Sequence, residues 1–179
     1  GVVSVSNNVP VGVYNVVIRA TDNCGATTDA AFTLTLNNNL PTISAAASVA
    51  RQQGSAASIS MIATVSDNET AAGNLTVAAT TVPVGLTVTS ITNVNGTISA
   101  SVGASCNASI GNNIVVLIVT DGNNATATAN LTVNVTANTP PTLTYANQTV
   151  AFGNTLTINP ATGPSDNGSI STIAVQSVT

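Results

Sequence analysis

The feature that most constrains the fold of this chain is an alternation of apolar and polar residues with a period of two. Residues 31–36 (AFTLTL) and 131–136 (LTVNVT) alternate apolar side chains with threonine or asparagine. The same pattern returns in residues 58–61, 86–89 and 155–158. Successive side chains of a β-strand point to opposite faces, so this period predicts half-buried strands. The threonines and valines of these runs are β-branched and suit a pleated sheet.

Two other runs, residues 13–20 and 114–119, are apolar almost throughout and predict central strands. No window of the sequence combines a helical period of 3.6 with helix caps. Short strands separated by turns at a spacing of about 8–12 residues predict an all-β sandwich or barrel. The turn signals are Pro10-Val11-Gly12, Asp22-Asn23-Cys24-Gly25, Asp67-Asn68, Asn95-Gly96, Asp121-Gly122-Asn123 and Asp166-Asn167-Gly168.

The chain also contains an internal repeat. Residues 16–22 (VVIRATD) match residues 115–121 (VVLIVTD), and each is followed by a polar loop and an alternating strand. Each then enters an Asn-rich linker, in residues 37–42 and 138–142. The residues after the two linkers match as well, from Pro41 to Asn68 and from Pro141 to Asn167. Matching segments that lie about 99 residues apart indicate tandem structural units.

The repeat predicts one complete domain at residues 39–138, flanked by two half-domains. Residues 1–38 correspond to the C-terminal half of a domain and residues 139–179 to the N-terminal half. Each half alone would expose an apolar face and open strand edges, yet the two halves are complementary. A direct join of Thr179 to Gly1 would lack 14 residues, about one hairpin, relative to the middle domain. Because Gly1 lies within a β-like run, we expect a permuted unit of a longer protein or polymer, in separate or continuous chains.

Residues 12–28 (GVYNVVIRATDNCGATT) and the Asn-x-Pro-Pro-Thr linker resemble the tandem immunoglobulin-like repeats of large bacterial surface proteins. These include hyalin-like and cadherin-like repeats, and the resemblance covers nearly the whole chain. It implies tandem immunoglobulin-like β-sandwiches, with strands E–G in residues 1–38 and strands A–C in residues 139–179. It also implies a secreted, multi-repeat adhesin, stalk or matrix fibre. The chain departs from calcium-binding cadherins because it lacks their acidic linker motif.

Composition excludes several classes of function. Among 179 residues there are two Arg, no Lys and no His, with a net charge of −4. Without His, neither a Ser-His-Asp or Cys-His catalytic group nor His-ligated zinc can form within this chain, and we expect no enzymatic activity. Two cations cannot neutralise a run of phosphates, so we expect no nucleic-acid partner and no binding to anionic membranes. No run of 18 apolar residues is present, so we expect no membrane-spanning segment.

Cys24 and Cys106 are the only cysteines. In a seven-stranded sandwich, Cys24 falls on the F–G loop at the N-terminal pole of its domain, and Cys106 falls on the E–F loop at the C-terminal pole of the middle domain. Within one chain they would lie about two domain lengths apart, far beyond the roughly 7 Å Cα separation that a disulfide tolerates. Because the C-terminal pole of the middle domain faces the next unit, we expect Cys106 to bond Cys24 of that unit. Two free thiols are the alternative.

Apart from Asp29, the acidic residues gather at loops near the predicted domain poles. Asp67, Glu69 and Asp121 fall close to one linker, and Asp22 and Asp166 fall on the equivalent loops near the other. Several oxygen donors at a domain junction could hold Ca²⁺, which takes six to eight oxygen ligands. The alternative is that Asp and Asn form turns with their own backbone. Calcium is the one cofactor that the sequence suggests.

Nine Asn-x-Ser/Thr sequons are candidate glycosylation sites, against about six expected by chance from the Asn, Ser and Thr content. They begin at Asn68, Asn74, Asn95, Asn107, Asn124, Asn130, Asn134, Asn147 and Asn167.

Taken together, the sequence favours a structural unit of an extracellular, cell-surface fibre, stalk or adhesin that assembles head to tail with copies of itself. A carbohydrate- or host-surface-binding module is one alternative, although only Tyr14, Phe32, Tyr145 and Phe152 could provide an aromatic surface. A spacer of a secreted enzyme is the other.

Overall fold

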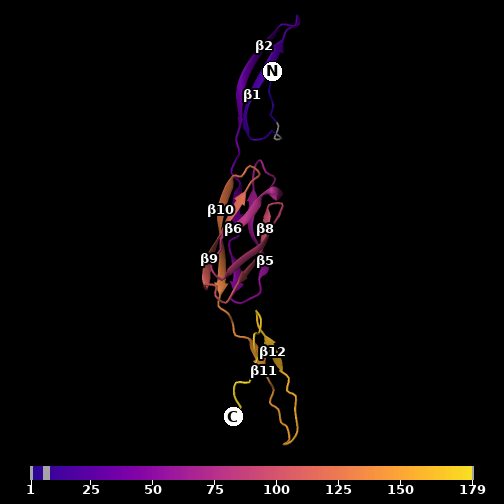
Figure 1. Ribbon diagram of the computed structural model, residues 1–179, viewed down its shortest axis with the longest axis vertical. Coiled ribbons are helices and arrows are strands. Elements are labelled where there is room, and N and C mark those ends of the chain that lie inside the picture. The colour runs from indigo at the N-terminus through magenta and orange to yellow at the C-terminus, as the bar shows by residue number, and fades with distance from the viewer. Residues whose placement is uncertain (1, 6–8, 179) are drawn as a thin grey trace.

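The computed structural model describes residues 2–5 and 9–178. The chain is an elongated row of three β-rich parts: an N-terminal hairpin, a middle part with most of the strands, and a small C-terminal part (Figure 1). Apart from one 3₁₀ turn, η1 (Ala72–Asn74), all regular elements of the described residues are strands. The expected all-β class is therefore confirmed. None of the described residues forms a helix long and apolar enough to cross a membrane.

The middle part consists of two four-stranded sheets packed face to face. Their strand orders are β3-β5-β8-β7 and β4-β10-β9-β6. Neighbouring strands run antiparallel except for β4, which lies parallel to β10. The first sheet comprises β3 (Thr42–Ala45), β5 (Ser58–Ser66), β7 (Leu86–Val94) and β8 (Thr97–Ala104). The second comprises β4 (Val49–Gln52), β6 (Thr76–Thr81), β9 (Gly111–Thr120) and β10 (Thr126–Thr136).

One hydrophobic core lies between these two sheets. Ile62 and Ile98 of the first sheet and Leu117 and Leu131 of the second are fully buried in the same cluster. The alternation seen in the sequence accounts for this burial, because every second residue of β10 points inward while threonine and asparagine point outward. Each such side chain contributes about 1.5–3 kcal/mol when it is removed from water. The middle part thus has a core of its own.

The predicted turn at Asn95-Gly96 joins β7 to β8 as a two-residue hairpin. Both residues have positive φ, 48° and 89°, as a type I′ turn requires. A side chain at Gly96 would also collide with the carbonyl oxygen of Val65, 2.7 Å from where its Cβ would lie. This turn places Val94 opposite Thr97 and thereby sets the register of the β7–β8 hairpin.

The N-terminal part is a two-stranded hairpin of β1 (Gly12–Thr21) and β2 (Thr27–Leu36). Its register is that of β9 and β10, displaced by 99 residues: Gly12 pairs with Leu36 as Gly111 pairs with Val135. The expectation that residues 13–20 form a central strand is wrong for the described residues, because β1 pairs with β2 alone. In contrast, β9 is central and pairs with both β10 and β6.

The turns of the two hairpins repeat each other at the level of single hydrogen bonds. Asp22 Oδ1 accepts the backbone N–H groups of Cys24 and Ala26, at 2.9 and 2.8 Å. Asp121 Oδ1 likewise accepts the N–H groups of Asn123 and Ala125, both at 2.8 Å. The repeat in the sequence is therefore also a repeat in backbone structure.

The C-terminal part repeats the beginning of the middle part. Its strands are β11 (Thr142–Thr144) and β12 (Thr162–Ser165), and Thr142 pairs with Ser165 as Thr42 pairs with Ser66. In both pairs the threonine hydroxyl donates to the serine carbonyl. Residues 155–158, predicted as a strand, form none in the described chain. Isolated two-stranded hairpins are marginal in water, and the described residues of the C-terminal part contain no further strand to order residues 155–158.

Candidate functional site

The apolar face of the N-terminal hairpin is only partly covered: Val16 and Leu34 are half-buried, and the part of the face nearer the β1–β2 turn is open. Ile18 is 42% exposed, whereas Leu117, at the matching position of β9, is fully buried. Phe32 is 40% exposed and its counterpart Leu131 is fully buried. The β1–β2 and β9–β10 hairpins have the same pattern of inward-facing apolar residues. Among the described residues, however, no sheet packs on the apolar face of β1–β2.

An open apolar hollow lies against this hairpin. It is formed where residues 3–5 run beside β1 and β2, and Val3, Val5, Val16 and Leu34 line it. The hydroxyl of Tyr14 donates to the carbonyl of Pro10 at 2.7 Å and fixes the entry into β1. The hollow faces the side on which the matching residues of β9 and β10 are covered by the first sheet.

The C-terminal part has an uncovered apolar surface of its own. Leu143 and Ile173 line a second hollow beside β11 and β12. Val175 is 83% exposed and belongs to no strand. In the sequence repeat, residues 173–177 (IAVQS) correspond to residues 75–79 (LTVAA), which include the start of β6. The segment that matches a sheet strand in the middle part is thus unpaired here.

The N-terminal pole of the middle part holds the linker through asparagine side chains. Asn38 Nδ2 donates to Asp121 Oδ2 at 2.6 Å, and Asn123 Nδ2 donates to Asn38 Oδ1 at 2.8 Å. Asn39 donates to both carboxylate oxygens of Glu69, with its side-chain amide at 2.5 Å and its backbone N–H at 3.3 Å. The Asn38 amide, together with the backbone donors of the turn, holds the pKa of Asp121 below its usual range, against the opposing effect of burial.

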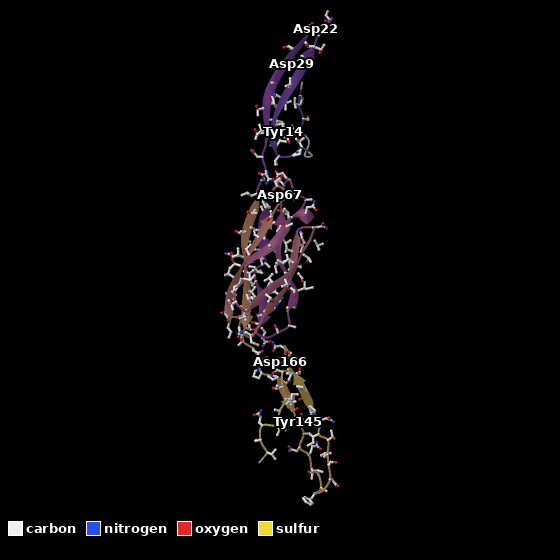
Figure 2. All side chains as sticks on the ribbon, viewed as in Figure 1. Tyr14, Asp22, Asp29, Asp67, Tyr145 and Asp166 are labelled. Atoms are coloured by element: carbon white, nitrogen blue, oxygen red, sulfur yellow. The ribbon has the colours of Figure 1, made fainter. Side chains whose placement is uncertain are left out.

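The acids proposed to bind calcium are expected in two groups, with Asp67, Glu69 and Asp121 near one linker and Asp22 and Asp166 near the other. Asp67 lies at the end of the middle part that faces the hairpin, Asp22 at the far hairpin tip, and Asp166 beyond the opposite end of the middle part (Figure 2). Asp67 accepts the backbone N–H groups of Glu69 and Thr70, so its carboxylate closes a local turn. Within residues 2–5 and 9–178, no cluster of three or more His, Cys, Asp or Glu side chains could hold a metal ion. Calcium binding stays a prediction.

The opposite pole gathers a different set of groups. The Gln53 side chain donates to the carbonyl of Ala108 at 2.6 Å and accepts the N–H of Asn138 at 3.4 Å. Asn167 Nδ2 donates to the backbone carbonyl of Gln53 at 3.4 Å. A side chain at Gly168 would collide with the carbonyl of Gly54. The loop after β12 therefore rests directly on the end of the middle part.

Cys24 and Cys106 are both exposed, free thiols in this single chain. Cys24 lies in the β1–β2 turn and Cys106 in the loop between β8 and β9. The disulfide expected between different units stays a prediction.

The nine sequon asparagines lie mostly at the surface. Seven are exposed, and Asn134 and Asn167 are half-buried. Asn130 and Asn134 alternate with the buried Leu131 and Val133, as the strand period predicts. Asn134 also donates to Asn112 Oδ1 at 2.7 Å, so its side chain is already engaged. Glycosylation stays a prediction.

Sequence reasoning missed the role of Arg51. Its guanidinium, from the end of β4, donates to the carbonyls of Val102 and Ser58, both at 2.7 Å, and to Ser60 Oγ at 2.8 Å. Burial lowers its pKa. It thereby connects the two sheets at one end of the middle part. Arg19 instead forms an exposed ion pair with Asp29 across the hairpin. No sequence signal distinguishes these two arginines.

No protein family model matches the chain, and no curated protein matches it. Among solved structures, an endo-fucoidan hydrolase of glycoside hydrolase family 107 shares 21% identity with a TM-score of 0.42, over 71% of this chain and 19% of that chain. Domains 4–9 of the surface layer protein SbsC share 18% identity with a TM-score of 0.38, over 76% of this chain and 20% of that chain. The chain spans about a fifth of each. Similarity at this level assigns neither a family nor a function.

Proposed function

We propose that the chain is a structural, non-catalytic unit of an extracellular fibre or stalk that assembles head to tail. The N-terminal hairpin of one copy completes the C-terminal part of another copy as an immunoglobulin-like sandwich. One observation carries the proposal: the β1–β2 hairpin has the pairing register and turn of β9–β10, but Ile18 and Phe32, whose counterparts are fully buried, are 42% and 40% exposed. In the middle part, β9 and β10 pack on the sheet β3-β5-β8-β7. In the fibre, the C-terminal part of the second copy supplies the corresponding surface for β1 and β2.

The middle part indicates which strand edges meet. There, β6 pairs with the edge of β9 that faces away from β10, and Val77 lies opposite Val119. The repeat relates β6 to residues 174–177 and β9 to β1. Val175 of one copy then lies opposite Ala20 of the next, in an antiparallel pair. This is the addition of a strand to an open sheet edge, in which backbone hydrogen bonds supply much of the affinity.

The hairpin that the join would lack belongs to the periphery of the sandwich. Its counterpart in the middle part, residues 80–95, contains β7, which is the edge strand of its sheet. Removing an edge strand leaves the remaining strands of both sheets paired to their neighbours. A completed sandwich of fewer strands is therefore compatible with the core described above.

Such contacts are heterologous, because the surface at one end of a copy binds a different surface at the other end. Contacts of this kind build open filaments when rotation does not close a ring. The low charge also suits this role. The chain contains 29 Thr and 23 Asn, and on strands such as β10 these residues occupy the outward positions where most soluble proteins have charged side chains.

Sedimentation over a range of protein concentrations tests the proposal on the 179-residue chain. We expect a series of species that grows with concentration and is cut to monomer by Ile18→Asp, which puts a charge on the face to be buried. Val13→Asp is the matched control, because Val13 is 71% exposed on the opposite face of β1 and its counterpart Asn112 stays exposed in the middle part. A single monomeric species at all concentrations, or equal effects of both variants, would contradict the proposal.

A further inference from the structure

The loop that follows β9 contacts the linker at the N-terminal pole of the middle part. Asp121 and Asn123 both bond the side chain of Asn38. The N–H of Gly122 donates to Thr70 Oγ1 at 3.0 Å, which ties this loop to the loop after β5. The pole is thus closed by three segments: the linker, the loop after β5 and the loop after β9.

At the C-terminal junction, only two of these three segments come from the same chain. Asn138 corresponds to the linker residue Asn38, and residues 166–169 correspond to residues 67–70. The third segment corresponds to residues 22–26, at the far tip of the N-terminal hairpin (Figure 1). The buried atom Asn167 Oδ1 has no hydrogen-bond partner, consistent with a missing neighbour. Asp166 Oδ1 also lacks a partner, but so does its counterpart Asp67 Oδ1 at the complete pole, so this atom does not bear on the junction.

Cys106 lies at this junction, on the side of the middle part. A Cβ atom placed on Gly54 would lie 3.3 Å from Cys106 Sγ and 3.7 Å from Asn138 Oδ1. The thiol and the linker amide therefore flank the same point of the backbone. Cys106 is exposed and has no disulfide partner within its own chain.

The hairpin tip of a second copy would bring the other thiol to the same place. Cys24 occupies the position that Asn123 occupies in the middle part, where the side chain reaches the linker amide at 2.8 Å. Docked in the same way on Asn138, Cys24 lies beside Cys106. We infer that a disulfide between Cys106 of one copy and Cys24 of the next locks each junction of the fibre, an inference that rests on the proposed head-to-tail assembly.

The bond forms by thiol–disulfide exchange with a disulfide oxidant. Two thiols lose two protons and two electrons, one S–S bond forms between the copies, and the S–S bond of the oxidant breaks to give two thiols. The same docking predicts two hydrogen bonds at the junction: the Asn138 amide donates to Asp22, and the N–H of Asn23 donates to Ser169. These match the bonds of Asn38 to Asp121 and of Gly122 to Thr70.

The test is oxidation of the folded chain with oxidised glutathione, followed by denaturing electrophoresis without reductant. The unaltered chain should give a ladder of covalent oligomers that collapses on reduction. Cys24→Ser alone and Cys106→Ser alone should stay monomeric, because each lacks one side of the junction. An equimolar mixture of the two variants should give a covalent dimer and nothing larger, since only one disulfide can form between them.

Two results would overturn the inference. One is dimer formation by either single variant as readily as by the mixture, which would show pairing of identical cysteines. The other is an absence of covalent species while sedimentation shows assembly. Sedimentation of the doubly substituted chain, with Cys24→Ser and Cys106→Ser together, separates the two proposals. The double variant should still assemble. If it stays monomeric while the unaltered chain forms only covalent oligomers, the disulfide is right and strand complementation is wrong.

Discussion

At the scale of single residues, the side chains of asparagine and aspartate close the turns of the chain and hold its linker in place. Asp22 and Asp121 each close the turn of a hairpin by accepting two backbone N–H groups. Asn38 and Asn39 fasten the linker to Asp121 and Glu69. Hydrogen bonds to an ionised acceptor are stronger than those between neutral groups. Apart from Asp29, which lies within β2, the few acids therefore sit where the chain turns or changes from one part to the next.

Asp121 should make the stability of the middle part depend on pH. Hydrogen bonds lower its pKa in the folded state, so folding favours the ionised form. The stabilisation is complete above the pKa of an unfolded Asp, about 3.9, and is lost as the pH falls through the lower pKa of the folded state. Thermal unfolding from pH 7 to pH 2 should show this loss, and Asp121→Asn should flatten it. Asn38→Ala should flatten it in the same direction, because it removes the main donor. Equal pH slopes in all three chains would contradict this account.

At the scale of the elements, the two-residue alternation was enough to predict most strands. The runs at residues 31–36, 58–61, 86–89 and 131–136 all lie within strands. The run at residues 155–158 has the same pattern and forms no strand. The reason is physical: alternation states which face a strand can bury, but a strand also needs neighbours to pair with. Alternation alone gives no information on those neighbours, whereas the repeat, which marks residues 139–179 as a half-domain, does.

The candidate site was predicted in part. The linkers and the acidic loops lie at the poles of the middle part, and the asparagine side chains that fasten the linker to these loops follow no motif. The role of Arg51 was not predictable either. Two of its contacts, Ser58 and Ser60, lie 7 and 9 residues along the chain, but the third, Val102, is 51 residues away. Only the packing of the two sheets brings these groups together around the guanidinium.

Matched positions in the two hairpins should respond differently to the same kind of substitution. Leu131→Ala removes a fully buried side chain and should lower the free energy of unfolding of the middle part by about 2–5 kcal/mol. Phe32→Ala, at the same register position of the N-terminal hairpin, should leave the unfolding of the dilute chain almost unchanged and weaken assembly. Chemical denaturation at low concentration and sedimentation at high concentration measure the two effects. If Phe32→Ala destabilised the dilute monomer as much as Leu131→Ala, the hairpin would already be packed, which would contradict the account.

At the scale of the whole molecule, the chain is a row in which only the middle part has a complete core. The two end parts repeat, at matching positions, the two portions of that middle part. Their exposed apolar faces explain why the unit should not remain alone in solution. A single polypeptide with further repeats would give the same arrangement. In either case the β1–β2 hairpin of one unit would pair with the C-terminal part of the preceding unit.

The central claim is that a second copy pairs with the free edge of β1, and residue-resolved hydrogen–deuterium exchange tests it most directly. Within the described residues of the single chain, the amides of β1 that point away from β2 have no strand partner. They should exchange quickly in dilute protein and become protected on assembly, together with the amides of residues 174–177. The exposed edge of β7, an edge strand in both states, is the internal control and should not change. Equally fast exchange of the β1 edge in dilute and assembled protein would contradict the claim.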